Sequence, residues 1–120
     1  MRVTDAVGAH GERVAARMLR DQGLLILATN WRCAHGELDI VARDPGTDEI
    51  VFVEVKTRRT TAFGHPAEAV TPSKVARLRR LAGMWSSRHP TPSAGMRLDV
   101  VAVQLPPGDR PRVRHLRGVG

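Results

Sequence analysis

Two stretches of the 120-residue chain place apolar side chains at helical spacing. The first predicts a helix that Asp5 caps and that runs to about Gln22, where Gly23 ends it. In the second, Thr71 caps a helix that has Pro72 at its first position. Small residues near the apolar stripe of the first helix would allow close packing on a sheet: Gly8, Gly11 and Ala15. The stripe of the second helix consists of Val75, Leu78, Leu81, Ala82 and Trp85.

Between the helices the pattern changes to alternation and to the short apolar runs that are typical of strands. Residues 24–28 predict a buried strand, and a loop over residues 29–36 follows it. Residues 37–43 and 49–56 predict a hairpin, because the tetrapeptide 44–47 has proline and glycine where a type II turn requires them.

The second half of the chain completes the predicted sheet. Residues 57–70 predict a loop, residues 98–105 a fourth strand and residues 112–116 a short edge strand. The order is therefore αβββαβ, with a C-terminal hairpin strand or tail over residues 106–120. We expect one α/β domain that spans the whole chain, with a core over about residues 5–105 and a central mixed β-sheet flanked by helices.

Charge is distributed unevenly along the chain. Residues 1–56 carry seven Arg or Lys and nine Asp or Glu, a net charge of −2, whereas residues 57–120 carry twelve and three, a net charge of +9. An acidic half beside a strongly basic half favours a polyanionic partner such as nucleic acid. The alternative is that the arginine-rich composition contributes only to solubility.

Composition also excludes several classes of protein. Cys33 is the only cysteine, which rules out an internal disulfide and a cysteine-rich zinc site. Residues 1–30 carry charges throughout and have no apolar region of the kind found in signal peptides. The longest apolar run, residues 24–28, is far shorter than the about 20 residues that cross a bilayer. We therefore expect a cytoplasmic protein with no membrane partner.

The most informative residues lie on the predicted hairpin. Lys56 is one of two lysines beside 17 arginines, which indicates that this position requires a compact ammonium group. Glu54 precedes it by two residues, so both side chains lie on one face of the strand. If residues 45–48 form the loop, the register sets Asp39 opposite Glu54 and Glu37 opposite Lys56. Two carboxylates about 5 Å apart repel each other and require a cation.

This constellation predicts metal-assisted phosphodiester hydrolysis with Mg²⁺ or Mn²⁺. Asp39, Glu54 and the main-chain carbonyl of Val55 would hold the ion, and Lys56 would orient the attacking water or stabilise the charge of the transition state. Glu12, on the first helix, would bind a metal through water or hold a second ion. The alternatives are an ordinary Glu–Lys cross-strand pair with solvated acids and, for Glu12, an exposed helix acid.

Five basic residues are candidates for phosphate contacts near this site: Arg58, Arg59, Lys74, Arg77 and Arg88. Such contacts position a nucleic acid without reading its sequence. With four aromatic residues and no tyrosine, a stacking platform for single strands is not expected. Asp99 lies among apolar residues and predicts a structural anchor for Arg97 or for a helix end. The histidines have no metal-site spacing and are expected at the surface: His10, His35, His65, His89 and His115.

Several motifs occur in order over residues 8–104. They are Gly11-Glu12, Gly36-Glu37-Leu38-Asp39, Val51 to Lys56 with Thr57-Arg58, Gly64, Lys74, and Arg97 to Val101. In these motifs the chain resembles the YraN-like family of small bacterial proteins. That family is similar in turn to the restriction-endonuclease-like, or PD-(D/E)xK, superfamily and especially to archaeal Holliday-junction resolvases.

The resemblance implies a restriction-endonuclease-like fold in which Asp39, Glu54 and Lys56 are the metal and catalytic residues. Glu12 would match the helix-borne acid of the resolvases. DNA is the implied partner, and a homodimer is one implied oligomeric state. Leu38 stands where the wider superfamily often has proline.

Three functions follow from these observations as hypotheses. The first is a divalent-metal-dependent endonuclease that acts on DNA, including branched or structured DNA. The second is a non-catalytic nucleic-acid-binding protein of the same fold in DNA repair or recombination. The third is a structural or interaction protein with an incidental basic face. The intact Asp39, Glu54 and Lys56 favour the first, because a pure binding protein gains nothing from acids that repel phosphate.

Overall fold

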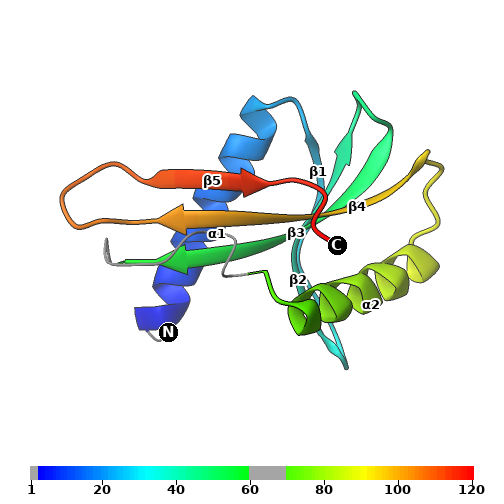
Figure 1. The fold of residues 1–120 in the computed structure, drawn as a ribbon, viewed down its shortest axis with the longest axis horizontal. Coiled ribbons are helices and arrows are strands. Elements are labelled where there is room, and N and C mark those ends of the chain that lie inside the picture. Colours follow the sequence, from blue (N-terminus) through cyan, green and yellow to red (C-terminus); the bar gives the residue numbers. More distant parts are fainter. Residues whose placement is uncertain (1–2, 60–69) are drawn as a thin grey trace.

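The computed structural model describes residues 3–59 and 70–120, and the rest of the predicted 57–70 loop lies outside the described residues. Two helices and five strands follow one another along the chain (Figure 1). They are α1 (Val3–Asp21), β1 (Leu25–Cys33), β2 (Gly36–Asp44), β3 (Glu49–Arg58), α2 (Pro72–Arg88), β4 (Gly95–Gln104) and β5 (Arg112–Leu116). The strands form one sheet in the order β1-β2-β3-β4-β5, antiparallel except for the parallel pair β3–β4.

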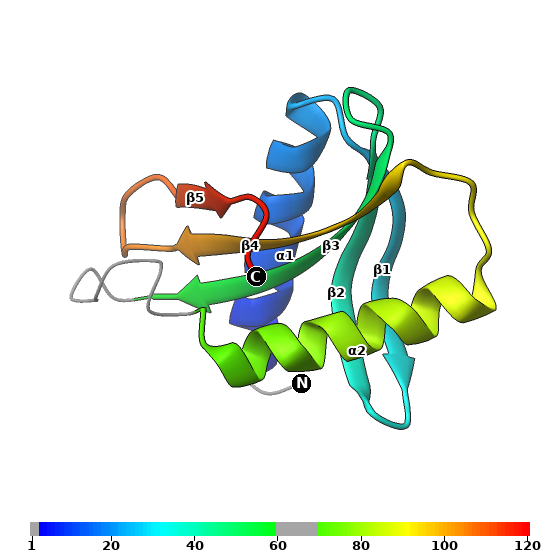
Figure 2. The same cartoon turned by 45° about the vertical axis from the view of Figure 1, so that its right-hand side comes forward.

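This arrangement confirms the predicted α/β fold with a mixed sheet flanked by helices, and it is compatible with a restriction-endonuclease-like fold. The one addition to the expected order is that residues 112–116 form a fifth strand of the same sheet. The two helices lie on opposite faces of the sheet (Figure 2). Alternate residues of β3 face the two helices: Val51 and Val53 belong to the α1-side core, and Phe52 to the α2-side core.

Helix α1 lies unusually close to the sheet. Gly11 is fully buried, and a Cβ at this position would lie 1.9 Å from Oγ1 of Thr57 on β3. A Cβ added at Gly8 would have no atom within 4 Å, so the packing requires glycine at position 11 but not at position 8. The helix begins at Val3, which places Asp5 inside it, and the predicted cap at Asp5 is therefore wrong.

Strand β1 differs from the prediction in length and exposure. It continues to Cys33, so the predicted loop over residues 29–36 is wrong. It is also an edge strand rather than a buried one, since Leu25 is 56% and Leu27 43% exposed. Apolar and polar residues alternate in the second half of β1 because one face is covered and the other is not.

The β2–β3 hairpin has the predicted register, from Asp44 opposite Glu49 to Ile40 opposite Val53. Its turn is not type II, because the left-handed residue is Asp48, with φ of 59°, and not Gly46. Pairing ends at Ile40 and Val53, and beyond this point β2 turns away from β3 (Figure 2). The two strands thus form a fork that opens toward the carboxyl end of β3.

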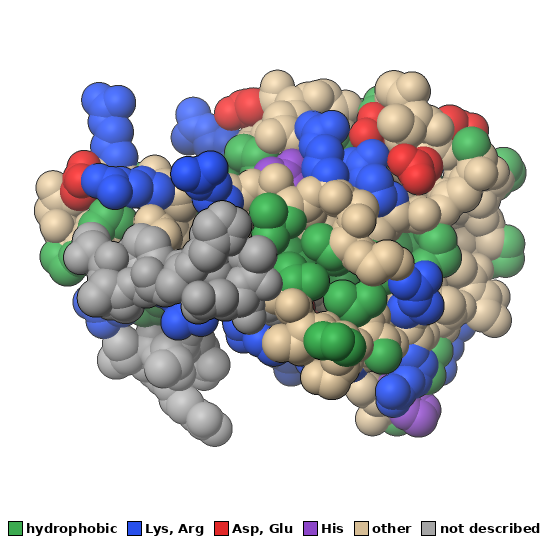
Figure 3. Space-filling view, in the orientation of Figure 1, with side chains coloured by type: hydrophobic (Ala, Val, Ile, Leu, Met, Phe, Trp, Pro, Cys, Tyr) green, Lys and Arg blue, Asp and Glu red, His purple; other side chains and the backbone are tan. Residues whose placement is uncertain are grey.

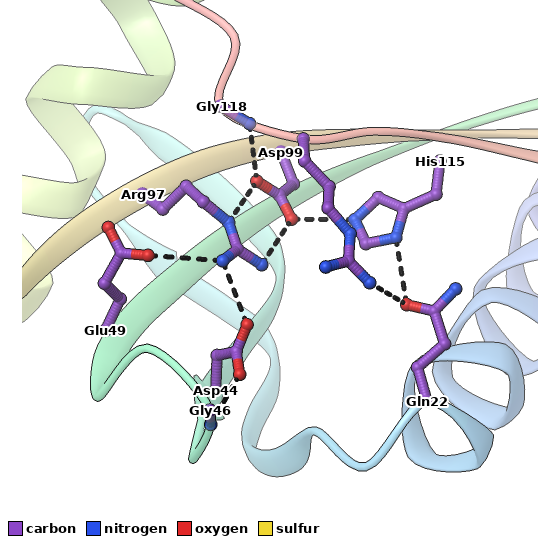
Figure 4. A network of polar contacts seen from close by, with 9 residues as sticks. Gln22, Asp44, Gly46, Glu49, Arg97, Asp99, His115 and Gly118 are labelled. Atoms are coloured by element: carbon purple, nitrogen blue, oxygen red, sulfur yellow. Dashed lines mark hydrogen bonds and ion pairs between the residues drawn. The ribbon is translucent and has the colours of Figure 1, made fainter.

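A network of charges joins β4 to the hairpin turn and to β5 (Figure 4). Asp99 is fully buried and accepts a hydrogen bond of 2.9 Å from the Arg97 guanidinium. Arg97 also contacts Asp44 at 3.0 Å and Glu49 at 3.2 Å. His115 Nε2 lies 2.7 Å from Oδ2 of Asp99. The expected anchoring of Arg97 by Asp99 is confirmed, whereas a surface position for His115 is wrong, because its side chain is 8% exposed.

Candidate functional site

The fork between β2 and β3 brings Asp39 to the centre of the candidate site. Asp39 is the first residue of β2 beyond the paired region, and its Oδ2 accepts a hydrogen bond of 2.7 Å from the Val55 N–H. The N–H and carbonyl of one residue lie on the same edge of an extended strand. The Val55 carbonyl therefore points into the fork beside Asp39, as a metal ligand would need to.

Three carboxylates converge at the base of this fork. Glu12 of α1, Glu37 and Asp39 each offer an oxygen, and these oxygens lie within 4.8 Å of one another. Glu12 reaches this point because Gly11 lets the helix approach β3 so closely. Glu37 does not lie opposite Lys56, and that prediction is wrong.

Two residues of β1 contact Glu37 and Glu12. With its amide nitrogen facing the acids, Asn30 donates hydrogen bonds to Glu12 Oε2 at 2.7 Å and to Glu37 Oε1 at 2.9 Å. Arg32 Nε lies 3.3 Å from Glu37 Oε2 in an exposed ion pair. Asn30 was assigned to a loop from the sequence, and the role of Glu37 was missed. Glu37 and Asp39 are two residues apart on one predicted strand, and this spacing could have indicated that both side chains lie on the same face at the site.

The acids are poorly compensated by protein groups. Burial raises the pKa of Asp39 to about 7, and the charges of Glu12, Glu54 and Glu37 add to this against the single Val55 N–H. Burial and the charge of Glu37 likewise raise the pKa of Glu12, although Asn30 and Arg32 oppose the shift. Asp39 and Glu12 therefore hold their protons more tightly than isolated acids and would gain from a cation.

The donor set fits a hard divalent ion. Mg²⁺ takes oxygen ligands and is bound in proteins through one or two carboxylates together with waters. Asp39, Glu12, Glu37 and the Val55 carbonyl supply such oxygens, and all of them face the fork. Glu54 lies close enough to raise the Asp39 pKa but is outside the three-acid cluster.

Glu54 instead pairs with a cation of α2. Arg77 donates to its Oε1, and the Glu54 side chain is 14% exposed while that of Arg77 is 48% exposed. Two further cations lie on this side of the fork. Burial and the adjacent charge of Lys56 lower the pKa of Lys74, and the two ammonium groups are within hydrogen-bonding reach. The only two lysines of the chain are therefore neighbours.

A pocket of about 420 Å³ lies between Glu12 and Lys56. Glu12 lines it from α1, and Lys56 and Arg59 line it from the end of β3. Of the predicted residues, Glu12, Val55, Lys56 and Arg59 thus line one pocket, whereas Glu54 and Lys74 line a separate small one.

Two of the predicted phosphate contacts lie elsewhere. Arg58 is exposed on the sheet beyond Lys56. Arg88 lies at the far end of α2, about 21 Å from Lys74 at 1.5 Å per residue. Its guanidinium is placed over the Trp31 ring, 5.6 Å from the ring centroid. The structure does not bring Arg88 to the fork.

None of the helices in residues 3–59 and 70–120 is long and apolar enough to cross a bilayer.

Comparison with known proteins identifies one family. Residues 11–103 match the model described as Uncharacterised protein family UPF0102, which is the YraN family. This range contains Glu12, Asp39, Glu54 and Lys56.

Three similar proteins, each named UPF0102 protein, illustrate the match. A relative from Beutenbergia cavernae is 58% identical over 120 residues and covers 100% of both chains. Relatives from Nocardia farcinica and Mycolicibacterium gilvum are 55% and 54% identical over 114 residues. These alignments cover 95% of this chain and 88% and 93% of the respective relatives.

Proposed function

Since the chain belongs to the UPF0102, or YraN, family, we propose that it is a divalent-metal-dependent phosphodiesterase, an endonuclease acting on DNA that includes branched or structured DNA. The observation that carries this proposal is the convergence of Glu12, Glu37 and Asp39, whose oxygens lie within 4.8 Å of one another. An acid that is buried among other acids, with one N–H as its hydrogen-bond donor, is suited to bind an external cation.

Asp39, Glu54 and the Val55 carbonyl would hold Mg²⁺ or Mn²⁺ at the fork, with Glu12 and Glu37 as direct or water-mediated ligands. A divalent ion at this position supplies charge neutralisation for the scissile phosphate and acidifies a water molecule. Asp39 must lose its proton to act as a ligand, so metal affinity should increase as the pH rises through about 7.

Lys56 would donate hydrogen bonds to the attacking water or to an oxygen of the scissile phosphate. It reaches the pocket that Glu12 also lines, so one phosphate can contact both the ammonium group and the acids' cation. Lys74 and Arg77 would hold the neighbouring phosphates at the start of α2, where the helix dipole also favours negative charge. These contacts position the backbone and do not read bases.

The proposal is tested by incubating the protein with linear, nicked and four-way DNA in Mg²⁺, Mn²⁺ or EDTA. We expect metal-dependent cutting by the wild type and loss of cutting in Asp39→Asn and Glu54→Gln. Asp21→Asn, which removes an exposed acid at the end of α1, is the matched control and should keep full activity. Cutting by the wild type that persists in both site variants would contradict the catalytic assignment.

The alternative is a non-catalytic nucleic-acid-binding protein of the same fold. It predicts DNA binding with steep salt dependence and no cutting under any metal condition. In the endonuclease, Glu54→Gln should bind DNA as tightly as the wild type or more tightly, because a repulsive acid has been removed. Wild-type binding without cutting would therefore favour the alternative.

A further inference from the structure

Part of the sheet face that bears α2 carries basic side chains that the metal site does not use. Three exposed arginines lie on it: Arg58 at the end of β3, and Arg112 and Arg114 on β5. Helix α2 packs on this face through a core of other residues, among them Leu38, Phe52 and Leu98. In Figure 3, basic side chains lie over the β4–β5 half of the face shown.

The strand register aligns these residues with the candidate site. Lys56 pairs with Ala102 on β4, which pairs with Arg114 on β5. Residues paired across adjacent strands lie on the same face of a sheet, so Arg114 lies on the face of Lys56. Two strand spacings separate their backbones, a distance of about 10 Å.

A second row repeats this arrangement two residues farther along. Arg58 pairs with Gln104, which pairs with Arg112. The rows are about 7 Å apart along the strands. Lys56, Arg58, Arg112 and Arg114 therefore form a basic surface on three adjacent strands, which we call the β5 surface.

The charge on this surface is almost uncompensated within the part of the chain that the structure describes. Arg112 makes one exposed ion pair, with Asp109 at 3.6 Å, and within residues 3–59 and 70–120 no ion pair involves Arg58 or Arg114. Glu54, two residues before Lys56 on β3, is already paired with Arg77. Like charges on one sheet face destabilise a fold, which indicates that an external anion stabilises them.

We propose that the β5 surface binds the backbone of a DNA duplex and carries it to the fork. This inference rests on the proposed function, and it assigns the contacts to β5 in addition to α2. No aromatic side chain belongs to the surface, which favours phosphate contacts over the stacking that single strands require. Arg58, Arg112 and Arg114 are exposed on three adjacent strands, as suits contact with an extended polyanion.

The test is binding of a fluorescein-labelled DNA duplex in EDTA, measured by anisotropy at a series of salt concentrations. The variant is Arg112→Ala with Arg114→Ala. Each phosphate contact contributes about 0.9 to the slope of log affinity against log salt, so the slope should become shallower by about 2. The matched control is Arg17→Ala with Arg20→Ala, which removes the same charge from exposed positions on α1, across the sheet.

The possible outcomes distinguish a role of the β5 surface from an effect of net charge and from a failure of the proposed function. A shallower slope and weaker binding in the β5 variant, with little change in the α1 control, support the proposal. Equal losses in the two variants overturn it, because the effect is then one of net charge only. Arg112→Lys with Arg114→Lys should bind like the wild type and distinguishes a charge effect from misfolding. A wild type that does not bind DNA contradicts the proposed function itself.

Discussion

Two aspartates of the sheet, Asp99 on β4 and Asp39 on β2, differ in what surrounds them. The pKa of Asp99 on β4 lies below its usual value. Burial alone would raise this pKa, but hydrogen bonds from His115, Arg97 and the Gly118 N–H outweigh the effect of burial. Asp39 on β2 is also buried, yet it accepts one main-chain N–H, and its pKa rises to about 7.

This difference indicates that Asp99 stabilises the fold and that Asp39 is available to bind a cation. Asp99 has its cations within the chain, so it stabilises the junction of β4, β5 and the hairpin turn (Figure 4). Asp39 lies with Glu12 and Glu37 instead, and the cation at this cluster, Arg32, pairs with Glu37 and not with Asp39. The sequence already predicts these two roles, an anchor for Arg97 at Asp99 and a metal ligand at Asp39, and the structure adds the contacts that distinguish them.

The largest effect should come from Asp99→Ala. It leaves Arg97 buried without its closest partner, and breaking a buried ion pair costs about 3–5 kcal/mol. The free energy of unfolding, measured by urea denaturation, should fall by this amount. Asp109→Ala, at an exposed ion pair, should change it by less than about 1 kcal/mol. Equal effects would contradict the structural role of Asp99.

The second prediction concerns pH in the metal-free protein. Asp39 has a higher pKa in the folded than in the unfolded state, so its contribution to stability is present below about pH 4 and is lost as the pH rises through about 7. Asp99 has the opposite shift, and its contribution is lost only as the pH falls below about 4. As the pH rises from 5 to 8, the loss of the Asp39 contribution should therefore lower the free energy of unfolding, on the order of 2–4 kcal/mol.

The matched variant for this pH effect is Asp39→Asn. It removes the titrating carboxyl, so urea denaturation in EDTA should give a smaller loss of stability between pH 5 and 8 than in the wild type. The difference between the two proteins isolates the contribution of the Asp39 carboxyl from that of all other groups. An identical pH dependence in both would show that Asp39 is ionised well below pH 7.

The third prediction tests how α1 delivers Glu12. In Gly11→Ala the new Cβ meets Thr57 and forces the helix away from β3, at a cost of about 1–3 kcal/mol in stability. Metal affinity should fall as well, because Glu12 moves with the helix. Gly8→Ala is the control, since nothing lies within 4 Å there and alanine favours the helix by up to about 1 kcal/mol. Similar destabilisation by both would contradict the close approach.

The smallest effect should come from Arg77→Ala. It frees Glu54 from a half-exposed ion pair, and such pairs contribute about 0.2–1 kcal/mol. Mg²⁺ affinity, measured by isothermal titration calorimetry, should therefore rise up to about fivefold. Arg80→Ala removes an exposed charge from the same helix and should leave the affinity unchanged. A lower affinity in Arg77→Ala would mean that Arg77 does not compete for Glu54.

Much of the fold could be predicted from the sequence. The cap and apolar stripe of α2 and the hairpin register from Asp44–Glu49 to Ile40–Val53 follow from local residue patterns, and they are confirmed. The predicted pairing of Asp39 with Glu54 is wrong, because the strands separate before these residues. The second half of β1 was predicted as a loop, because its pairing with β2 depends on a distant segment and its polar residues reflect an exposed edge. Local pattern cannot reveal which strand lies at the edge of a sheet.

The candidate site could be predicted only in part. Asp39, Glu54 and Lys56 were found because they share one hairpin. Glu37 and Asn30 were missed, since the fork turns Glu37 away from Lys56 and toward α1. The Arg77–Glu54 pair and the cations of β5 depend on tertiary packing and on strand order, which no short motif specifies.

The most direct test of the central claim is a calorimetric titration of Mn²⁺ at pH 7, repeated in buffers of different ionisation enthalpy. If Asp39 has no ion-pair partner among the residues that the structure describes, the wild type should bind Mn²⁺ and release protons, because Asp39 must deprotonate. Asp39→Asn should lose the binding, and Asp99→Asn, where it remains folded, should keep it. Binding of equal strength in the wild type and Asp39→Asn would contradict the account.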